Sequence, residues 1–218
     1  MSEIGQFDKT ILAERRVKTS GFYEEPSGET PHGSFRGRPI IGKDMPVEGG
    51  VYLGAGAREA IVVDEKYGEL VRIYKRVREE LEKESGKGAL SGRIFRKVFD
   101  IVKEELPFDQ KKVDGEVAQF NGDTKVALDH FIQKKAGVCR HQALLTAYLF
   151  QKLKQDGIVQ GSASIDRNAV SGKGGHAWVR YTNRVGDVFI IDPAQDYIGP
   201  LKDESLKDRW FYKRPEDT

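Results

Sequence analysis

The stretch Gly137-Val138-Cys139-Arg140-His141-Gln142-Ala143-Leu144-Leu145 decides the fold expected for this chain. It contains the only cysteine, directly after a glycine, and opens a segment (143–153) that is apolar on nearly every side. Such a segment predicts a buried central helix. A thiol at the start of a helix faces the positive end of the helix dipole, which lowers its pKa and favours a nucleophilic thiolate. The alternative is a buried core thiol, as free cysteines often are.

The segment after this helix predicts a pair of antiparallel strands. His176 begins a strand of about 176–181, and Asp192 ends a strand of about 187–192. Pairing the two strands as a hairpin places His176 directly opposite Asp192 on one face, where β-carbons lie about 4.5–5.5 Å apart. That spacing suits a carboxylate that accepts a hydrogen bond from an imidazole and fixes its tautomer.

Three stretches then resemble a known superfamily: Gly137-Val138-Cys139, Gly175-His176-Ala177-Trp178-Val179 and Ile191-Asp192-Pro193-Ala194. They are similar to the signature stretches of the transglutaminase-like superfamily, which resembles papain-like enzymes in arrangement. The resemblance covers about residues 90–200. It implies an α+β fold with a papain-like, transglutaminase-like core, in which a central helix packs on an antiparallel sheet, and with an N-terminal extension.

The resemblance also implies roles for residues. Cys139 would attack an amide carbonyl as a thiolate, His176 would hold its proton and deliver it to the leaving amine, and Asp192 would orient His176. The implied function is thiol-dependent acyl transfer on peptide or glutamine amide bonds. Hydrolysis is favoured over cross-linking, since no dense acidic cluster for calcium is present. The alternative is a protein-binding module that keeps the fold without turnover.

Four further residues are candidates for the cleft. The backbone N–H of the cysteine would be one oxyanion donor, and Gln133 and Asn121 are rival side-chain donors. Arg140, in the first helical turn, would tune the thiol electrostatically. Trp178 shares the expected face of His176 and would either wall the cleft or belong to the core.

Composition narrows the class of protein and its partners. The 36 basic and 34 acidic residues give a net charge of +2, which is no argument for a nucleic acid or an anionic membrane as partner. No apolar run approaches a membrane span, and the N-terminus has no apolar segment typical of a secretory signal. One cysteine excludes an intrachain disulfide, so we expect a cytoplasmic protein that acts on a protein or peptide substrate. The four histidines lack metal-ligand spacing, so no metal or cofactor is expected.

The expected organisation has four parts. Residues 1–50 hold half of the eight prolines and eight of the 24 glycines, which predicts an extended arm without regular secondary structure. They are followed by a strand-and-helix appendage (51–88), the catalytic core (89–201) and a C-terminal tail (202–218).

Apolar periodicity predicts the helices, and glycine predicts the loops. Helices are expected at about 65–84, 90–105, 126–133 and 139–154. The Gly54/Gly56 pair begins like a dinucleotide-binding loop, but Glu59 stands where the third glycine belongs. We therefore interpret the pair as a simple turn. The glycine-rich segment 166–175 is interpreted as a flexible loop.

Overall fold

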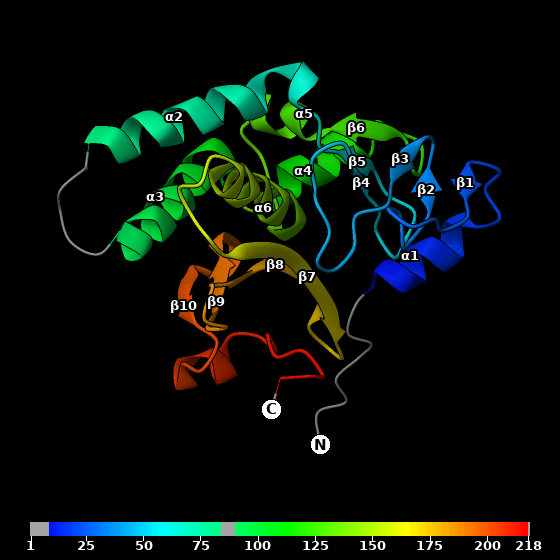
Figure 1. Cartoon of the computed structure of the whole chain (residues 1–218). Helices are drawn as coiled ribbons and strands as arrows, with labels where there is room; N and C mark the ends of the chain where they lie inside the picture. Colours follow the sequence, from blue (N-terminus) through cyan, green and yellow to red (C-terminus); the bar gives the residue numbers. More distant parts are fainter. Residues whose placement is uncertain (1–8, 84–89, 218) are drawn as a thin grey trace.

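A computed structural model describes residues 9–83 and 90–217 of the chain. Over these residues the fold is mixed α+β, with six α-helices and three sheets. The expected α+β class is therefore confirmed. Figure 1 shows helix α6 in the middle of the molecule, with helices above it and a sheet below it.

Helix α6, Cys139–Gln155, is the centre of the fold. Eleven of its 17 residues are buried, which confirms the predicted central helix. On one side it packs against α2 (Glu69–Lys83), α3 (Leu90–Glu105) and α5 (Leu128–Gln133), and on the other it packs against the sheet.

The outer helices follow the sequence pattern closely. Helix α3 has the predicted bounds, whereas α2 begins four residues later than expected. A short 3-10 helix, Glu65–Tyr67, precedes α2 and ends at Gly68, whose φ of 94° only glycine adopts readily. Helix α4, Gln110–Val117, was not predicted; Asp109 caps it by accepting a hydrogen bond from the N–H of Lys112 at 2.9 Å.

The main sheet has the order β10-β9-β8-β7, and all its strands are antiparallel. Ala177, Val179 and Tyr181 belong to the core that surrounds α6, while Trp178 and Ile190 belong to a separate cluster with the C-terminal tail. Successive side chains of a strand point to opposite faces, so each face of the sheet is covered by a different part of the chain. The strands are β7 (Ser162–Val170), β8 (Gly174–Thr182), β9 (Val188–Asp192) and β10 (Tyr197–Pro200).

The register of the β8–β9 hairpin differs from the expected one by two residues. Val179 lies opposite Ile191, so the prediction that His176 lies directly opposite Asp192 is wrong. The turn is centred one residue later than expected, because the N–H of Asn183 bonds to the carbonyl of Asp187 at 2.9 Å. A shift of two residues keeps every side chain on its face, which leaves Asp192 diagonal to His176.

The loop expected at 166–175 is also wrong. Strand β7 continues to Val170, and β8 already begins at Gly174. Polar residues of the segment are buried because each has a partner. Asp166 pairs with Arg214, and Asn168 accepts a hydrogen bond from the indole of Trp210 at 2.6 Å.

Residues 9–50 are more ordered than the expected extended arm, whose first eight residues lie outside the described ranges. They contain α1 (Thr10–Val17) and a small sheet of the two-residue strands β1 (Tyr23–Glu24), β2 (Ser34–Phe35) and β3 (Arg38–Pro39). The glycine and proline content of this part gave no sign of its apolar residues, which form a second core with residues 51–62. The members of this core are Ala13, Val17, Phe35, Ile40, Val51, Leu53, Ala60 and Val62.

The third sheet joins this N-terminal part to the rest of the fold. It pairs β4 (Val51–Tyr52) antiparallel with β5 (Ala60–Val62), and β5 parallel with β6 (Lys125–Ala127). Strand β6 lies within the expected catalytic core, so the pairing crosses the expected boundaries. The division of the chain into four parts stays a prediction.

The C-terminal tail packs under the sheet (Figure 1). Trp210 and Tyr212 are buried, as expected of aromatic anchors. Arg214 bonds to both carboxyl oxygens of buried Asp166, at 2.6 and 2.8 Å, and to Asp44 in the N-terminal part. Over the two described ranges, no helix has the length and apolar character needed to cross a membrane.

The Arg214–Asp166 pair leads to a stability prediction. Arg214→Met leaves Asp166 buried without its cation, which lowers the free energy of unfolding by about 3–5 kcal/mol in urea titrations. Asp44→Asn, which changes only the exposed partner, costs at most about 1 kcal/mol. Adding Asp166→Asn to Arg214→Met recovers part of the loss. Equal losses in Arg214→Met and Asp44→Asn would contradict the prediction.

Candidate active site

Cys139 is the first residue of α6 and is partly exposed. Val138 before it is extended, and its N–H donates to Nδ1 of buried His141 at 3.2 Å, which fixes the first turn. A Cβ at Gly137 would lie 3.2 Å from Leu106, so glycine permits the close approach of the chain at this point. The thiol is thereby held at a helix start, as the sequence predicts.

His176 and Asp192 lie together at the end of the β8–β9 ladder. Nε2 of His176 is 2.5 Å from Oδ2 of Asp192, and both side chains are buried. Asp192 is held in turn, because its Oδ1 accepts from the N–H of Gln195 at 3.2 Å and its Oδ2 accepts from the hydroxyl of Tyr212 at 2.7 Å. Because Asp192 engages Nε2, Nδ1 is the ring nitrogen left for the contact with the thiol.

The thiol meets the sheet where β9 has ended. Strand β9 stops at Asp192, and beyond the last β8–β9 pair the edge of β8 is uncovered. The thiol of Cys139 takes that place, where it is hydrogen-bonded to His176 and to the backbone N–H of Ala177.

These contacts set the protonation of the pair. Burial raises the pKa of the Cys139 thiol, but the hydrogen bond and charge of His176 and the N–H of Ala177 outweigh it and hold the pKa below that of a free thiol. Burial lowers the pKa of His176, but Asp192 and the thiol outweigh it and raise the pKa to about 10. Both shifts favour the form in which the pair is a thiolate and an imidazolium.

Aromatic rings enclose the imidazole from behind. Trp178 stacks on His176 with ring centroids 5.9 Å apart, and Trp210 lies at 5.0 Å. Trp178 is fully buried and packs edge-on against Tyr212, so it is a core residue behind His176 and does not wall the cleft. No local pattern in the sequence links Tyr212 to the site, because 20 residues separate it from Asp192 along the chain.

The structure separates the other candidates. Gln133 ends α5 and Asn121 lies in a turn before β6; both are exposed and neither lines the cleft beside Cys139. Arg140 does line this cleft, and its Nε donates to Glu59 at 2.6 Å. The structure therefore supports neither rival as the oxyanion donor.

The cleft beside the thiol has a volume of about 220 Å³. Part of its wall is the loop 54–58, which the sequence analysis interpreted as a simple turn. Glu59, directly after this loop, links it to the site. Its buried carboxylate needs a partner and pairs with Arg140 in the first turn of α6. The lining residues are Lys9, Tyr52, Gly54, Ala55, Gly56, Arg58, Cys139, Arg140, Arg167, Gly175, His176 and Ala177.

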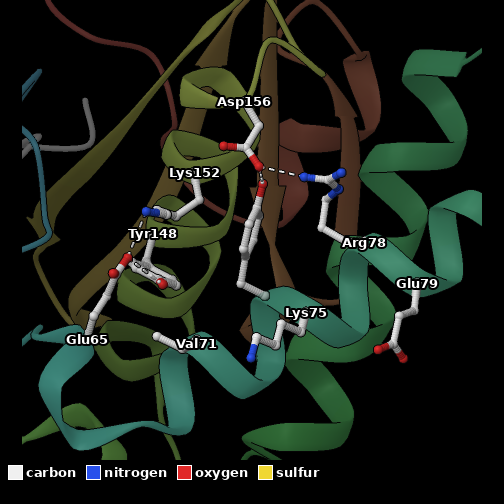
Figure 2. A pocket seen from close by; sticks show the side chains of 9 residues that line it. Glu65, Val71, Lys75, Arg78, Glu79, Tyr148, Lys152 and Asp156 are labelled. Atoms are coloured by element: carbon white, nitrogen blue, oxygen red, sulfur yellow. Dashed lines mark hydrogen bonds and ion pairs between the residues drawn. The ribbon is translucent and has the colours of Figure 1, made fainter.

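A larger hollow of about 400 Å³ lies between α2 and α6 (Figure 2). Several of its polar groups are paired with one another. Glu65 accepts from Tyr148 and Lys152 at 2.9 Å, and Asp156 accepts from Arg78 at 2.6 Å. Neither a thiol nor a histidine lines it, so the smaller cleft is the candidate active site.

No cluster of histidine, cysteine, aspartate or glutamate able to hold a metal ion occurs within residues 9–83 and 90–217. Comparisons of the chain with protein-family models, with curated proteins and with solved structures found no match.

The contact between Cys139 and His176 predicts an unusual thiol titration. Alkylation by iodoacetamide rises with pH through a midpoint below the roughly 8.5 of free cysteine. In His176→Ala the main lowering contact is gone while burial remains, so the midpoint moves up from that of the parent. The urea-unfolded chain, which carries the same single thiol, is the reference. The same midpoint in all three samples would show an ordinary thiol.

Proposed function

We propose that this chain is a cysteine-dependent acyl-transfer enzyme of transglutaminase-like type that acts on peptide or glutamine amide bonds. The observation that carries the proposal is the chain of contacts from Cys139 through His176 to Asp192, assembled from a helix start and two strands. Each residue has the type and the neighbour that its role requires. The buried central helix against an antiparallel sheet agrees with the papain-like core that the resemblance implies.

The proposed chemistry begins with the Cys139 thiolate, which attacks the amide carbonyl and forms a tetrahedral oxyanion. The free backbone N–H groups at the start of α6 point toward that charge, and the N–H of Cys139 is the donor we assign. As the C–N bond breaks, Nδ1 of His176 gives its proton to the leaving amine. A thioester on Cys139 remains.

Water resolves the thioester in the favoured hydrolytic reaction. Nδ1 of His176 takes a proton from the water, and the hydroxide attacks the thioester carbonyl. The carboxylic acid leaves, and the thiolate–imidazolium pair is restored. Asp192 stabilises the imidazolium in both halves of the reaction through its 2.5 Å contact with Nε2. An amine in place of water would give cross-linking, which the proposal ranks second.

Substitution of Cys139 and of Asp192 tests this function. With a peptide library, hydrolysis is measured both as cleavage and as ammonia release. Cys139→Ser nearly abolishes turnover, because the hydroxyl is not ionised in this setting. Asp192→Asn lowers kcat by about 10³–10⁴-fold, because the imidazole loses its orienting charge.

The matched control is Asp187→Asn, at the exposed start of the β9 side of the hairpin, which leaves kcat unchanged. Unfolding in urea checks that each variant is folded. A fully folded Asp192→Asn variant with the parent rate would refute the assigned roles. Failure of an amide-mimic thiol probe to label Cys139 faster than free cysteine would favour the binding module instead.

A further inference from the structure

The cleft beside Cys139 carries an excess of positive charge. Four of its lining residues are cationic, Lys9, Arg58, Arg140 and Arg167, and none of those lining it is acidic. Glu59 offsets only Arg140. The triad of Cys139, His176 and Asp192 adds at most one net negative charge, because the charges of the thiolate and the imidazolium cancel, so an excess of positive charge remains.

Arg167 leaves a hydrogen-bond donor unused in this cleft. Its side chain is only 4% exposed and lies on β7 directly opposite Ala177. Nη1 donates to the carbonyl of Leu53 at 2.6 Å, and Nε donates to the hydroxyl of Thr10 at 3.1 Å. Nη2 is buried with no partner in the part of the chain that the structure describes. A buried, charged donor without a partner is costly, so its retention at the cleft indicates a ligand.

Lys9 brings a second charge to the same place. A Cβ at Gly175 would lie 2.7 Å from its Nζ, so the amine lies directly against the backbone before His176. No described carboxylate forms an ion pair with Lys9. Burial lowers the pKa of Lys9, and the nearby charges of Arg167 and Arg58 lower it further, which outweighs the opposite effect of Cys139.

We propose that the cleft selects acidic peptides, binding a carboxylate next to the scissile amide through Nη2 of Arg167 and the charges of Lys9 and Arg58. This inference rests on the proposed function and adds the substrate class to it. A carboxylate would satisfy the unused donor with a charge-assisted hydrogen bond. The surrounding cations would raise the local concentration of an anionic substrate.

The first test measures the charge of the cleft without turnover. The rate of Cys139 alkylation by anionic iodoacetate is divided by the rate with neutral iodoacetamide, in the folded parent and in the urea-unfolded chain. We expect the ratio to be at least about fivefold higher in the folded parent, the factor that one unit charge at about 4 Å gives in water. Raising the salt concentration reduces the difference.

Variants locate the effect. Lys9→Gln and Arg58→Gln each lower the ratio by severalfold, whereas Arg184→Gln, in the exposed turn at the other end of β8, does not change it. Arg58 is exposed, so its substitution tests the charge of the cleft without disturbing the fold. Substitution of Arg167 would also break its hydrogen bonds to the N-terminal part. An unchanged ratio in both cleft variants would overturn the inference.

The second test uses substrates. Peptide amides with glutamate beside the scissile bond are turned over with a kcat/KM at least about tenfold above that of their glutamine isosteres, and Lys9→Gln narrows the gap. Equal kcat/KM values would overturn the inference but leave the proposed function intact. Iodoacetamide labelling no faster than in the unfolded chain would instead refute the activated thiol, and the proposed function with it.

Discussion

The contact between the Cys139 thiol and His176 depends on where α6 begins relative to where β9 ends. A helix start supplies free N–H groups and a positive potential, and a strand end supplies an uncovered edge. Because β9 stops at Asp192, the thiol reaches the N–H of Ala177 and the imidazole together. Lengthening β9 by one pair would fill the place that the thiol takes.

The C-terminal tail covers the side of His176 that faces away from the thiol. Trp210 and Tyr212 pack behind the sheet, and Tyr212 bonds to the same oxygen of Asp192 that His176 contacts. Arg214 ties the tail to Asp166 on β7. A buried ion pair adds little stability compared with apolar packing, but breaking it is costly, so it fixes one arrangement of the tail over the site.

The front of the cleft depends on the beginning of the chain. The N-terminal part contributes Lys9 and the loop 54–58, and Arg167 of β7 bonds to Leu53 and Thr10 there. The same guanidinium thus joins two parts of the fold and lines the cleft. The basic character of the cleft is local, because the net charge of the whole chain is only +2.

The sequence by itself determined the central helix, the bounds of α3 and the identity of the three residues that meet. These depend on local patterns: helical periodicity fixes a buried face, and alternation fixes which strand residues share a face. The predicted register of the β8–β9 hairpin was wrong by two residues, yet His176 and Asp192 still lie on the same face, because the side-chain period of a strand is two.

Only the tertiary structure decided the rest. Asp166, Arg167 and Asn168 resemble a loop in the sequence, since polar residues are normally exposed, and they form a buried strand because Arg214, Leu53 and Trp210 supply their partners. Residues 13–40 of the N-terminal arm likewise become ordered through apolar contacts with residues 51–62. Partners more than 40 residues away along the chain leave no periodic signal, so the walls of the cleft and their charge could be found only in the folded molecule.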